Sequence, residues 1–368
     1  MKLRKTISWL MGTLQRSLFP KLEECWNSPL TEKEKRLVSI LELAQVERSV
    51  PKCSGTQWLG RKLCERESIA RSFIAKSVYG YPTTRALIEA LETTPSLRRI
   101  CGFGKVSDIP SESTFSRAFG EFAKSGLCDN VHEALVERSL KSELIGHISR
   151  DSTAIEGREK PAKKLPKQKP PRRKRGRRAK GEQPEPKEEK RMKRQVHQSA
   201  QEALRELPVV CDVGVKKNSK GYKVKWIGYK LHADVNDCGL PVSVAMTSAS
   251  LHDSQVAIPL MKMTSSRVPY CYDLMDAAYD AGPIYEVSRD LGHVPIIDKN
   301  SRGKDVIPMA PHEASRYNER SAVERFNSRL KEEFGGCNVM VRGAEKVKAH
   351  LMFGVIAIFA DQLLKLVS

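Results

Sequence analysis

Residues 317–331, YNERSAVERFNSRLK, place Tyr, Arg, Glu and Lys at the spacing Y-x2-R-x3-E-x6-K. On a helix, which advances about 100° per residue, Arg320 and Glu324 lie one turn apart and Lys331 lies two turns further on. All three side chains can therefore face one side, with one carboxylate among cations that suit phosphate oxygens. A metal-dependent reaction on a DNA phosphate needs such a set. Taken alone, the stretch is also compatible with a solvated, charge-laced surface helix.

The residues before this stretch have the pattern of a mixed α/β domain. The expected elements, in chain order, are strands at 144–149, 222–235 and 240–246, a helix at 253–263, a strand at 270–275, a helix at 283–291, a strand at 294–297 and the helix quoted above. Asp151 and Asp276 follow the first and fourth of these strands, and Glu324 lies on the last helix. This order matches the ribonuclease-H-like fold, with a mixed five-stranded sheet and helices, in which the first and fourth strands are neighbours and the last helix crosses beside them.

Asp151, Asp276 and Glu324 are therefore expected to converge on one site. Hard oxygen ligands of this kind hold Mg²⁺ or Mn²⁺, and two ions about 3.5 to 4 Å apart can activate a nucleophile and stabilise a leaving oxygen. Such a site needs no side-chain nucleophile.

Other acidic residues compete for these positions. Asp273 lies three residues before Asp276 and is expected on the opposite face of the strand, in a structural role. Asp280 precedes Gly282-Pro283 and is predicted to cap a helix or turn. Glu319 competes with Glu324 on the last helix, and the spacing of the quoted stretch favours Glu324.

Histidines and aromatic residues near these strands have simpler interpretations. His232 and His252 have no histidine partner at metal-ligand spacing, so hydrogen-bonding roles are favoured over ligation. Trp226 and Tyr229 are expected to pack on the sheet and not to stack on bases.

The composition indicates a polyanionic partner. The chain has 368 residues and a formal net charge of +20, with a pI near 9.6, which favours nucleic acid. Its nine Cys form no CxxC pair, which favours reduced thiols in the cytosol over a zinc site or disulfides. The basic N-terminus resembles no signal peptide. The apolar run 351–360 is too short to span a bilayer and predicts a buried helix, so no membrane association is expected.

The predicted organisation has five parts. They are a helical DNA-binding domain at 1–140, the first catalytic strand with its Asp at 141–156, a basic disordered linker at 157–205, the rest of the catalytic domain at 206–343 and a C-terminal helix at 344–368. Within the first part, residues 109–119 are compatible with a DNA-recognition helix and equally with an ordinary helix of a small bundle. The C-terminal helix is expected to pack on the catalytic core, although its apolar face would also suit a dimer contact.

The centre of the linker is a block of basic residues that would bind phosphates without reading bases. The block contains Arg172, Arg173, Lys174, Arg175, Arg177 and Arg178. A solubilising linker and a nuclear-localisation signal are the alternative interpretations.

The chain resembles the bacterial insertion-sequence transposases of the DDE class that carry the Y-R-E-K signature. The resemblance covers residues 146–336 and rests on motifs that occur in the family's order. They are Arg150 to Thr153, Gly228 to Asp234 with Gly239 to Pro241, Leu251 to Ser254, Asp276 to Asp280, and Tyr317 to Lys331. Ala278 stands where the family often has Gly, and the interval from Asp276 to Glu324 is too short for the strand-rich insertion of some relatives.

The resemblance implies that Asp151, Asp276 and Glu324 are the catalytic metal ligands, with Mg²⁺ or Mn²⁺ as cofactor. It implies that Tyr317, Arg320 and Lys331 contact DNA phosphates or order the strand end. The expected reaction is hydrolysis of a strand at the element's ends to a 3′-hydroxyl, followed by strand transfer into target DNA.

The expected partners are double-stranded DNA and a second copy of the chain when assembled on DNA, in the bacterial cytoplasm beside the nucleoid. A non-catalytic DNA-binding descendant of a transposase and a simple metal-dependent nuclease of the same fold are the alternatives.

Overall fold

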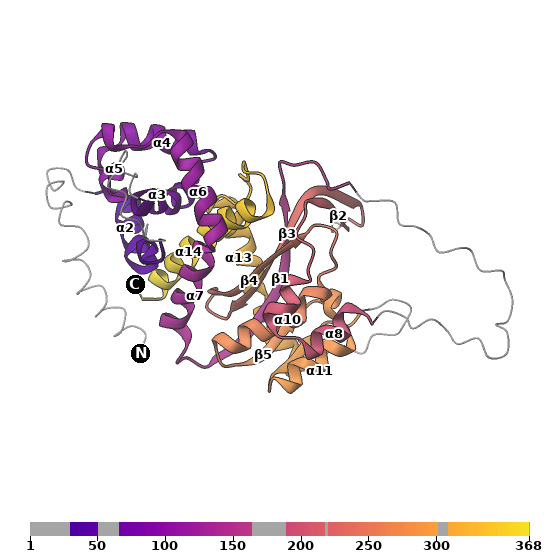
Figure 1. Cartoon of the computed structure of the whole chain (residues 1–368). Coiled ribbons are helices and arrows are strands. Elements are labelled where there is room, and N and C mark those ends of the chain that lie inside the picture. The colour runs from indigo at the N-terminus through magenta and orange to yellow at the C-terminus, as the bar shows by residue number, and fades with distance from the viewer. Residues whose placement is uncertain (1–29, 51–65, 164–188, 218–219, 301–307, 368) are drawn as a thin grey trace, which may run out of the picture.

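The structure is a computed structural model that describes residues 30–50, 66–163, 189–217, 220–300 and 308–367. A group of helices from both ends of the chain lies beside a mixed sheet that has helices on both faces (Figure 1). The predicted mixed α/β architecture with a helical N-terminal region is confirmed.

The N-terminal region is helical throughout its described part. Its helices are α2 (Glu32–Ala44), α3 (Arg66–Tyr79), α4 (Thr84–Thr93), α5 (Pro95–Cys101), α6 (Glu112–Ser125) and α7 (Leu127–Leu140). Local sequence sets their ends: Thr31 Oγ1 accepts from the Glu34 N–H at 3.3 Å, and the Glu34 carboxylate accepts from the Thr31 N–H at 2.7 Å. This capping box starts α2. Gly126, with a φ of 66°, ends α6 in the left-handed region, where glycine is favoured.

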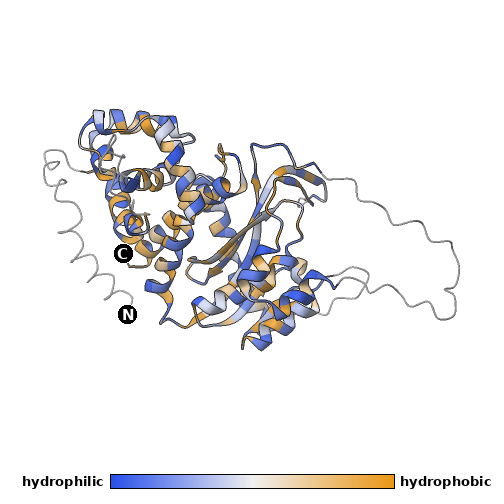
Figure 2. Cartoon of the chain, in the orientation of Figure 1, coloured by the Kyte–Doolittle hydropathy of each residue, from blue (hydrophilic) through white to orange (hydrophobic). Residues whose placement is uncertain are grey.

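The C-terminal helix α14 (Ala344–Val367) forms the centre of the helical group. It is long and apolar enough to cross a membrane by length and composition, but 72% of its most apolar window is buried inside the protein. The helices around it alternate hydrophobic and hydrophilic residues, as amphipathic helices on a shared core do (Figure 2). A buried C-terminal helix is therefore confirmed. Its main partners are α2, α3, α6 and α7, with α13 (Ser321–Glu332) and β4 (Pro241–Ser248) as further contacts. It therefore packs chiefly on the N-terminal helices and only to a small extent on the sheet.

Within the described residues the sheet has six strands, one more than predicted. They are β1 (Ile145–Glu156), β2 (Asp212–Lys217), β3 (Lys223–Asn236), β4 (Pro241–Ser248), β5 (Tyr270–Met275) and β6 (Val294–Ile297). The order is β2-β3-β1-β5-β6, and β4 also pairs with β3. β1 and β5 are parallel neighbours, which confirms the predicted adjacency of the first and fourth predicted strands.

One predicted strand limit was wrong, and one strand was not predicted. β1 does not end at Asp151 but continues to Glu156, because residues 152–156 pair antiparallel with residues 232–228 of β3. β2 was not predicted; its sequence, DVGVKK, contains a glycine and two lysines and has weak strand character by itself. It is a strand because it pairs with the start of β3.

Part of the segment predicted as a disordered linker is helical. α8 (Arg191–His197) and α9 (Ala200–Arg205) lie in it and pack on α10 (Ser254–Arg267). The buried Gln195 donates to the Gln255 carbonyl at 2.9 Å. Lys262 Nζ donates to the carbonyls of Gln195 and Val196 at 2.9 and 2.8 Å, at the C-terminal end of α8. Tertiary contacts of this kind are not visible as a local sequence pattern.

The quoted stretch is not one uniform helix. Tyr317 ends α12 (Pro311–Tyr317), a 3₁₀ turn follows at Asn318–Arg320, and α13 spans Ser321–Glu332. Tyr317, Arg320 and Ser321 keep right-handed helical backbone angles, so the chain direction is maintained across the turn. The predicted relation of Arg320 to Glu324 is therefore preserved.

Candidate active site

Two of the three predicted catalytic carboxylates come from adjacent parallel strands. β1 and β5 are in register up to Arg150 and Met275, so Asp151 and Asp276 are the next residues on neighbouring strands, which lie about 4.8 Å apart. The side chain of Asp276 is held by the N–H of Ala278, which donates to Oδ1 at 2.9 Å. The sheet itself thus brings these two carboxylates together.

Burial and mutual repulsion make these two carboxylates difficult to ionise. Burial, together with the charge of Asp276, raises the pKa of Asp151 to about 6, although the Ser152 N–H and Arg320 oppose the rise. Burial also raises the pKa of Asp276, against the Ala278 N–H and Arg320. A nearby cation favours the ionised form of two carboxylates that are paired and buried in this way.

In this structure the nearby cation is Arg320. Its Nη2 donates to Glu324 Oε1 at 2.6 Å, and its pKa is raised, against the effect of burial, by Tyr317, Glu324, Asp151 and Asp276. The Glu324 side chain is 56% exposed. Arg320 therefore lies within the electrostatic reach of all three predicted ligands.

The three carboxylates do not form a preassembled cage. Among the described residues, no group of three His, Cys, Asp or Glu side chains is arranged to hold a metal ion. Glu324 is turned to Arg320, whereas Asp151 and Asp276 are adjacent. The predicted convergence is thus seen for two ligands, with the third on a helix that packs against β1.

Asn327 is a site residue that sequence reasoning missed. It lies three residues after Glu324, and its Nδ2 is 3.5 Å from Asp151 Oδ2. Its Oδ1 is buried without a hydrogen-bond partner in the described part of the chain. Two desolvated carboxylates and an unsatisfied amide oxygen form a hard donor set, which fits Mg²⁺ or Mn²⁺. The helical spacing from Glu324 was the signal that would have found this residue.

Asp253, before α10, is a second missed neighbour of the site. It accepts from Lys230 Nζ at 2.9 Å, and against the effect of burial His232 and Lys230 lower its pKa. Its negative charge contributes to the raised pKa values of Asp151 and Asp276. Asp253 thus adds negative charge beside the site while remaining paired to Lys230.

The α12–α13 segment is fixed on the same face of the sheet. Ser149 Oγ donates to the Glu319 carbonyl at 3.2 Å. The Arg316 guanidinium lies 4.3 Å from the centre of the Tyr272 ring, and that ring stacks on His147 at 5.1 Å. These contacts on β1 and β5 orient the segment so that Arg320 faces the carboxylates.

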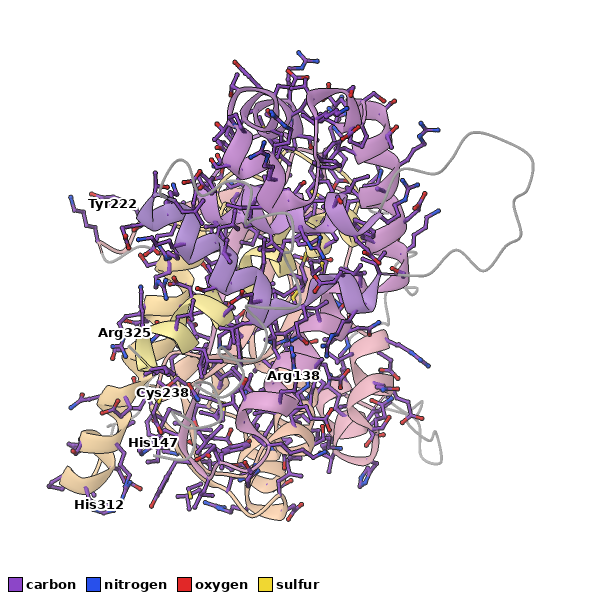
Figure 3. The ribbon with its side chains drawn as sticks, turned by 90° about the vertical axis from the view of Figure 1, so that its left-hand side faces the viewer. Arg138, His147, Tyr222, Cys238, His312 and Arg325 are labelled. Carbon is purple, nitrogen blue, oxygen red and sulfur yellow. The ribbon has the colours of Figure 1, made fainter. Side chains whose placement is uncertain are left out.

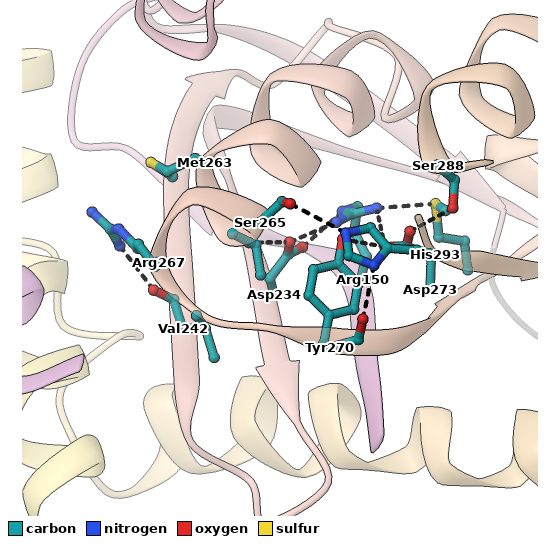
Figure 4. A network of polar contacts seen from close by, with 12 residues as sticks. Arg150, Asp234, Val242, Met263, Ser265, Arg267, Tyr270, Asp273, Ser288 and His293 are labelled. Carbon is teal, nitrogen blue, oxygen red and sulfur yellow. Dashed lines mark hydrogen bonds and ion pairs between the residues drawn. The ribbon is translucent and has the colours of Figure 1, made fainter. Parts of the chain in front are cut away.

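A buried ionic network supports the other face of the sheet (Figure 4). Arg150 is 1% exposed and donates to both carboxylate oxygens of Asp234, at 2.7 and 2.6 Å, and to Asp273 at 3.3 Å. Ser288 of α11 (Gly282–Asp290) and Thr264 of α10 donate to these aspartates at 2.7 and 2.6 Å. The network therefore joins β1, β3, β5 and two helices directly behind Asp151. The predicted structural role of Asp273 is confirmed.

The competing residues have mostly the predicted roles. His232 is buried, and its Nε2 is hydrogen-bonded to Thr247 Oγ1 at 2.8 Å. His252 Nδ1 is hydrogen-bonded to Ser254 Oγ at 2.8 Å. Trp226 and Tyr229 are buried. Asp280 is the C-cap residue of the 3₁₀ turn Ala277–Tyr279, as predicted. Its carboxylate also accepts from the Tyr285 hydroxyl and the Asn300 N–H, both at 3.1 Å.

The predicted DNA contacts are only partly described. The Arg320 guanidinium lies 5.6 Å from the centre of the Tyr317 ring. Lys331 is at the end of α13, and burial together with the charge of Lys216 lowers its pKa. The basic block from Arg172 to Arg178 lies outside the described residues.

Comparison with known families gives this geometry a context. The model of the Transposase DDE domain matches residues 144–360, which include β1, the sheet and both carboxylate-bearing strands. The Transposase domain (DUF772) matches residues 27–121 in the helical region. No curated protein and no solved structure matches the chain.

Both matches define the chain as a transposase, an enzyme of DNA transposition. The first spans more than half of the sequence, and the chain belongs to the DDE transposases. Members of this family act on DNA and use divalent metal ions.

Proposed function

We propose that this chain is the transposase of a bacterial insertion sequence, which binds the ends of its own element, hydrolyses a strand to free a 3′-hydroxyl and joins that hydroxyl to target DNA. The observation that carries the proposal is the adjacency of Asp151 and Asp276 on neighbouring strands, with raised pKa values and with Arg320 facing them. The strand order and the helix across the sheet support a ribonuclease-H-like core.

Asp151, Asp276 and Glu324 would hold two Mg²⁺ or Mn²⁺ ions, with the Asn327 amide beside them. The ions would supply Lewis-acid activation of the attacking oxygen and stabilisation of the leaving oxygen. The chain's own contribution is to hold the carboxylates close together, partly removed from water and in fixed register.

Arg320 has two roles in this proposal. Without other cations it compensates the three carboxylates and is paired to Glu324. With divalent cations bound to the carboxylates, the guanidinium would be available for a DNA phosphate, which its planar donors fit. Tyr317 and Lys331 would contact the same backbone.

The remaining parts would serve DNA capture. The helical region up to residue 140 would recognise the element ends, and the catalytic part would comprise residues 141–156 and 206–343. The basic block from Arg172 to Arg178 would bind phosphates without reading bases. Synapsis of two ends would require at least a homodimer on DNA, in the cytoplasm beside the nucleoid.

The proposal is tested with a labelled duplex that spans the boundary between the element encoding this chain and its flanking DNA. With Mg²⁺ we expect strand cleavage at the boundary, and at least tenfold less cleavage of a duplex with the same composition and shuffled ends. Equal cleavage of both duplexes would instead indicate a simple nuclease. Binding without cleavage in Mg²⁺ and in Mn²⁺ would favour a non-catalytic DNA-binding protein.

A further inference from the structure

β2 and the beginning of β3 form a two-stranded ribbon that extends beyond the rest of the sheet. Residues 212–217 pair antiparallel with residues 228–223. The pairing of β1 with β3 begins at Glu156 and Gly228, so in the described chain β1 does not accompany the ribbon. We use "ribbon" for residues 212–217 and 223–228.

The ribbon has a fixed origin. Gly228 has a φ of 151°, and a Cβ there would lie 2.1 Å from the Ile155 carbonyl oxygen, so only glycine fits where the ribbon leaves the sheet. The indole of Trp226 covers Gly214, where a Cβ would be 2.3 Å from the ring. Trp226 Nε1 also donates to the Tyr229 carbonyl at 3.1 Å. The base of the ribbon is therefore anchored to the sheet.

The outer part of the ribbon is basic. Between residues 212 and 228 the sequence has five lysines and a single acidic residue, Asp212, which lies at the base. Lys216, Lys223 and Lys225 are exposed. Figure 3 shows Tyr222, between the two strands, at the periphery of the molecule. A side-by-side pair of strands with such a charge is complementary to a polyanion.

One lysine of the ribbon lies near the helix that carries Glu324. Burial and the charge of Lys216 lower the pKa of Lys331, and the charge of Asp151 opposes this effect. Lys216 and Asp151 therefore both lie within electrostatic reach of Lys331. Lys331 belongs to α13, whereas Lys216 belongs to β2. Positive charge thus continues from the helix that carries Glu324 onto the ribbon.

We propose that the ribbon binds the sugar-phosphate backbone of duplex DNA beside the cleavage position, through Lys223 and Lys225 on one face of the ribbon and Lys216 on the other. This inference rests on the proposed function and adds a contact surface for its DNA. The five-residue step from Gly228 to Lys223 covers roughly 17 Å at about 3.4 Å per residue, which corresponds to about five base pairs. Lysines contact phosphates as flexible point charges, so the contact is independent of base sequence.

Protection of an open sheet edge is the simpler explanation for lysines on a ribbon, because charged side chains discourage edge-to-edge pairing. It predicts a different result. Loss of the lysines would then cause self-association of the protein and leave its affinity for DNA unchanged.

The test uses the full chain with Lys216, Lys223 and Lys225 all replaced by Gln. Affinity for a 30-base-pair duplex of arbitrary sequence is measured by fluorescence anisotropy without divalent metal, over a series of salt concentrations. The dissociation constant is expected to rise roughly a hundredfold at 0.1 M salt, and the slope of log K against log salt to fall by about 3. Sedimentation of the same variant reports its association state.

The matched control replaces three exposed lysines remote from the ribbon, Lys193, Lys346 and Lys365, and removes the same net charge. The proposal would be overturned if both triple variants lost the same affinity for DNA. It would also be overturned if the ribbon variant kept its affinity, whether or not it self-associates. In those cases, metal-dependent cleavage by the native chain would still support the proposed transposase function. A native chain that binds no duplex would overturn both.

Discussion

Asp151→Asn and Asp276→Asn are each expected to lower the rate of metal-dependent strand cleavage by at least about a thousandfold, because a lost metal ligand removes several kcal/mol of transition-state stabilisation. Both side chains lie at neighbouring strand positions, so neither replaces the other. Since each substitution removes negative charge beside Arg320, affinity for DNA is expected to stay equal or to increase. Cleavage and binding are measured on the same labelled boundary duplex.

Asp280→Asn is the matched control for this pair. Asp280 is four residues after Asp276, but its carboxylate accepts from Tyr285 and Asn300. Its replacement is expected to leave the cleavage rate within about threefold of the native value, since Asn keeps one of the two acceptor oxygens and neither hydrogen-bond partner belongs to the candidate site. An equal loss in Asp280→Asn, or native rates in Asp276→Asn, would refute the assignment of the two catalytic carboxylates.

Arg150→Met is expected to lower the free energy of unfolding by about 3 to 5 kcal/mol, because it leaves two buried carboxylates without their cation. Asp234 and Asp273 are both fully buried, and each accepts from the Arg150 guanidinium. Arg150→Lys is expected to recover only part of the loss, since an ammonium cannot form the paired contact with Asp234. Urea unfolding monitored by circular dichroism gives the difference.

Arg117→Met is the control for the loss of an arginine. Arg117 is exposed on α6, and such substitutions usually change stability by less than about 0.5 kcal/mol. If Arg150→Met were no more destabilising than Arg117→Met, the network behind Asp151 would not contribute to the stability of the sheet.

The sequence predicted the strands whose patterns are local. The hairpin β3–β4 was found from its turn residues 236–239, and β5 from a short apolar run before Asp276. β2 was missed because its own sequence has weak strand character, although its partner, the start of β3, is close in sequence. α8 and α9 were missed because they are stabilised by partners distant in sequence, such as Lys262 of α10, which donates to a carbonyl near the end of α8. The extension of β1 was missed because residues 152–156, three of which are polar, are held by a partner distant in sequence, β3.

The candidate site was predictable to the extent that it depends on strand order. Because β1 and β5 are neighbouring parallel strands, their backbones bring Asp151 and Asp276 together regardless of the side-chain rotamers. The rotamer of Glu324 was not predictable, because it follows the local charge and pairs with Arg320. Asp253 was missed because a lysine-paired carboxylate has no distinctive spacing in the sequence. Asn327 has helical spacing from Glu324, but an amide at that spacing does not by itself indicate a site residue.

Metal dependence of cleavage by Asp276→Cys tests the central claim most directly. Thiolate is a soft ligand that favours Mn²⁺ over Mg²⁺, whereas carboxylate accepts both. If Asp276 binds the catalytic metal, the ratio of the cleavage rate in Mn²⁺ to that in Mg²⁺ should be at least tenfold higher for the variant than for the native chain, and a chelator should abolish cleavage by both. An unchanged ratio, or cleavage that persists in excess chelator, would contradict the account.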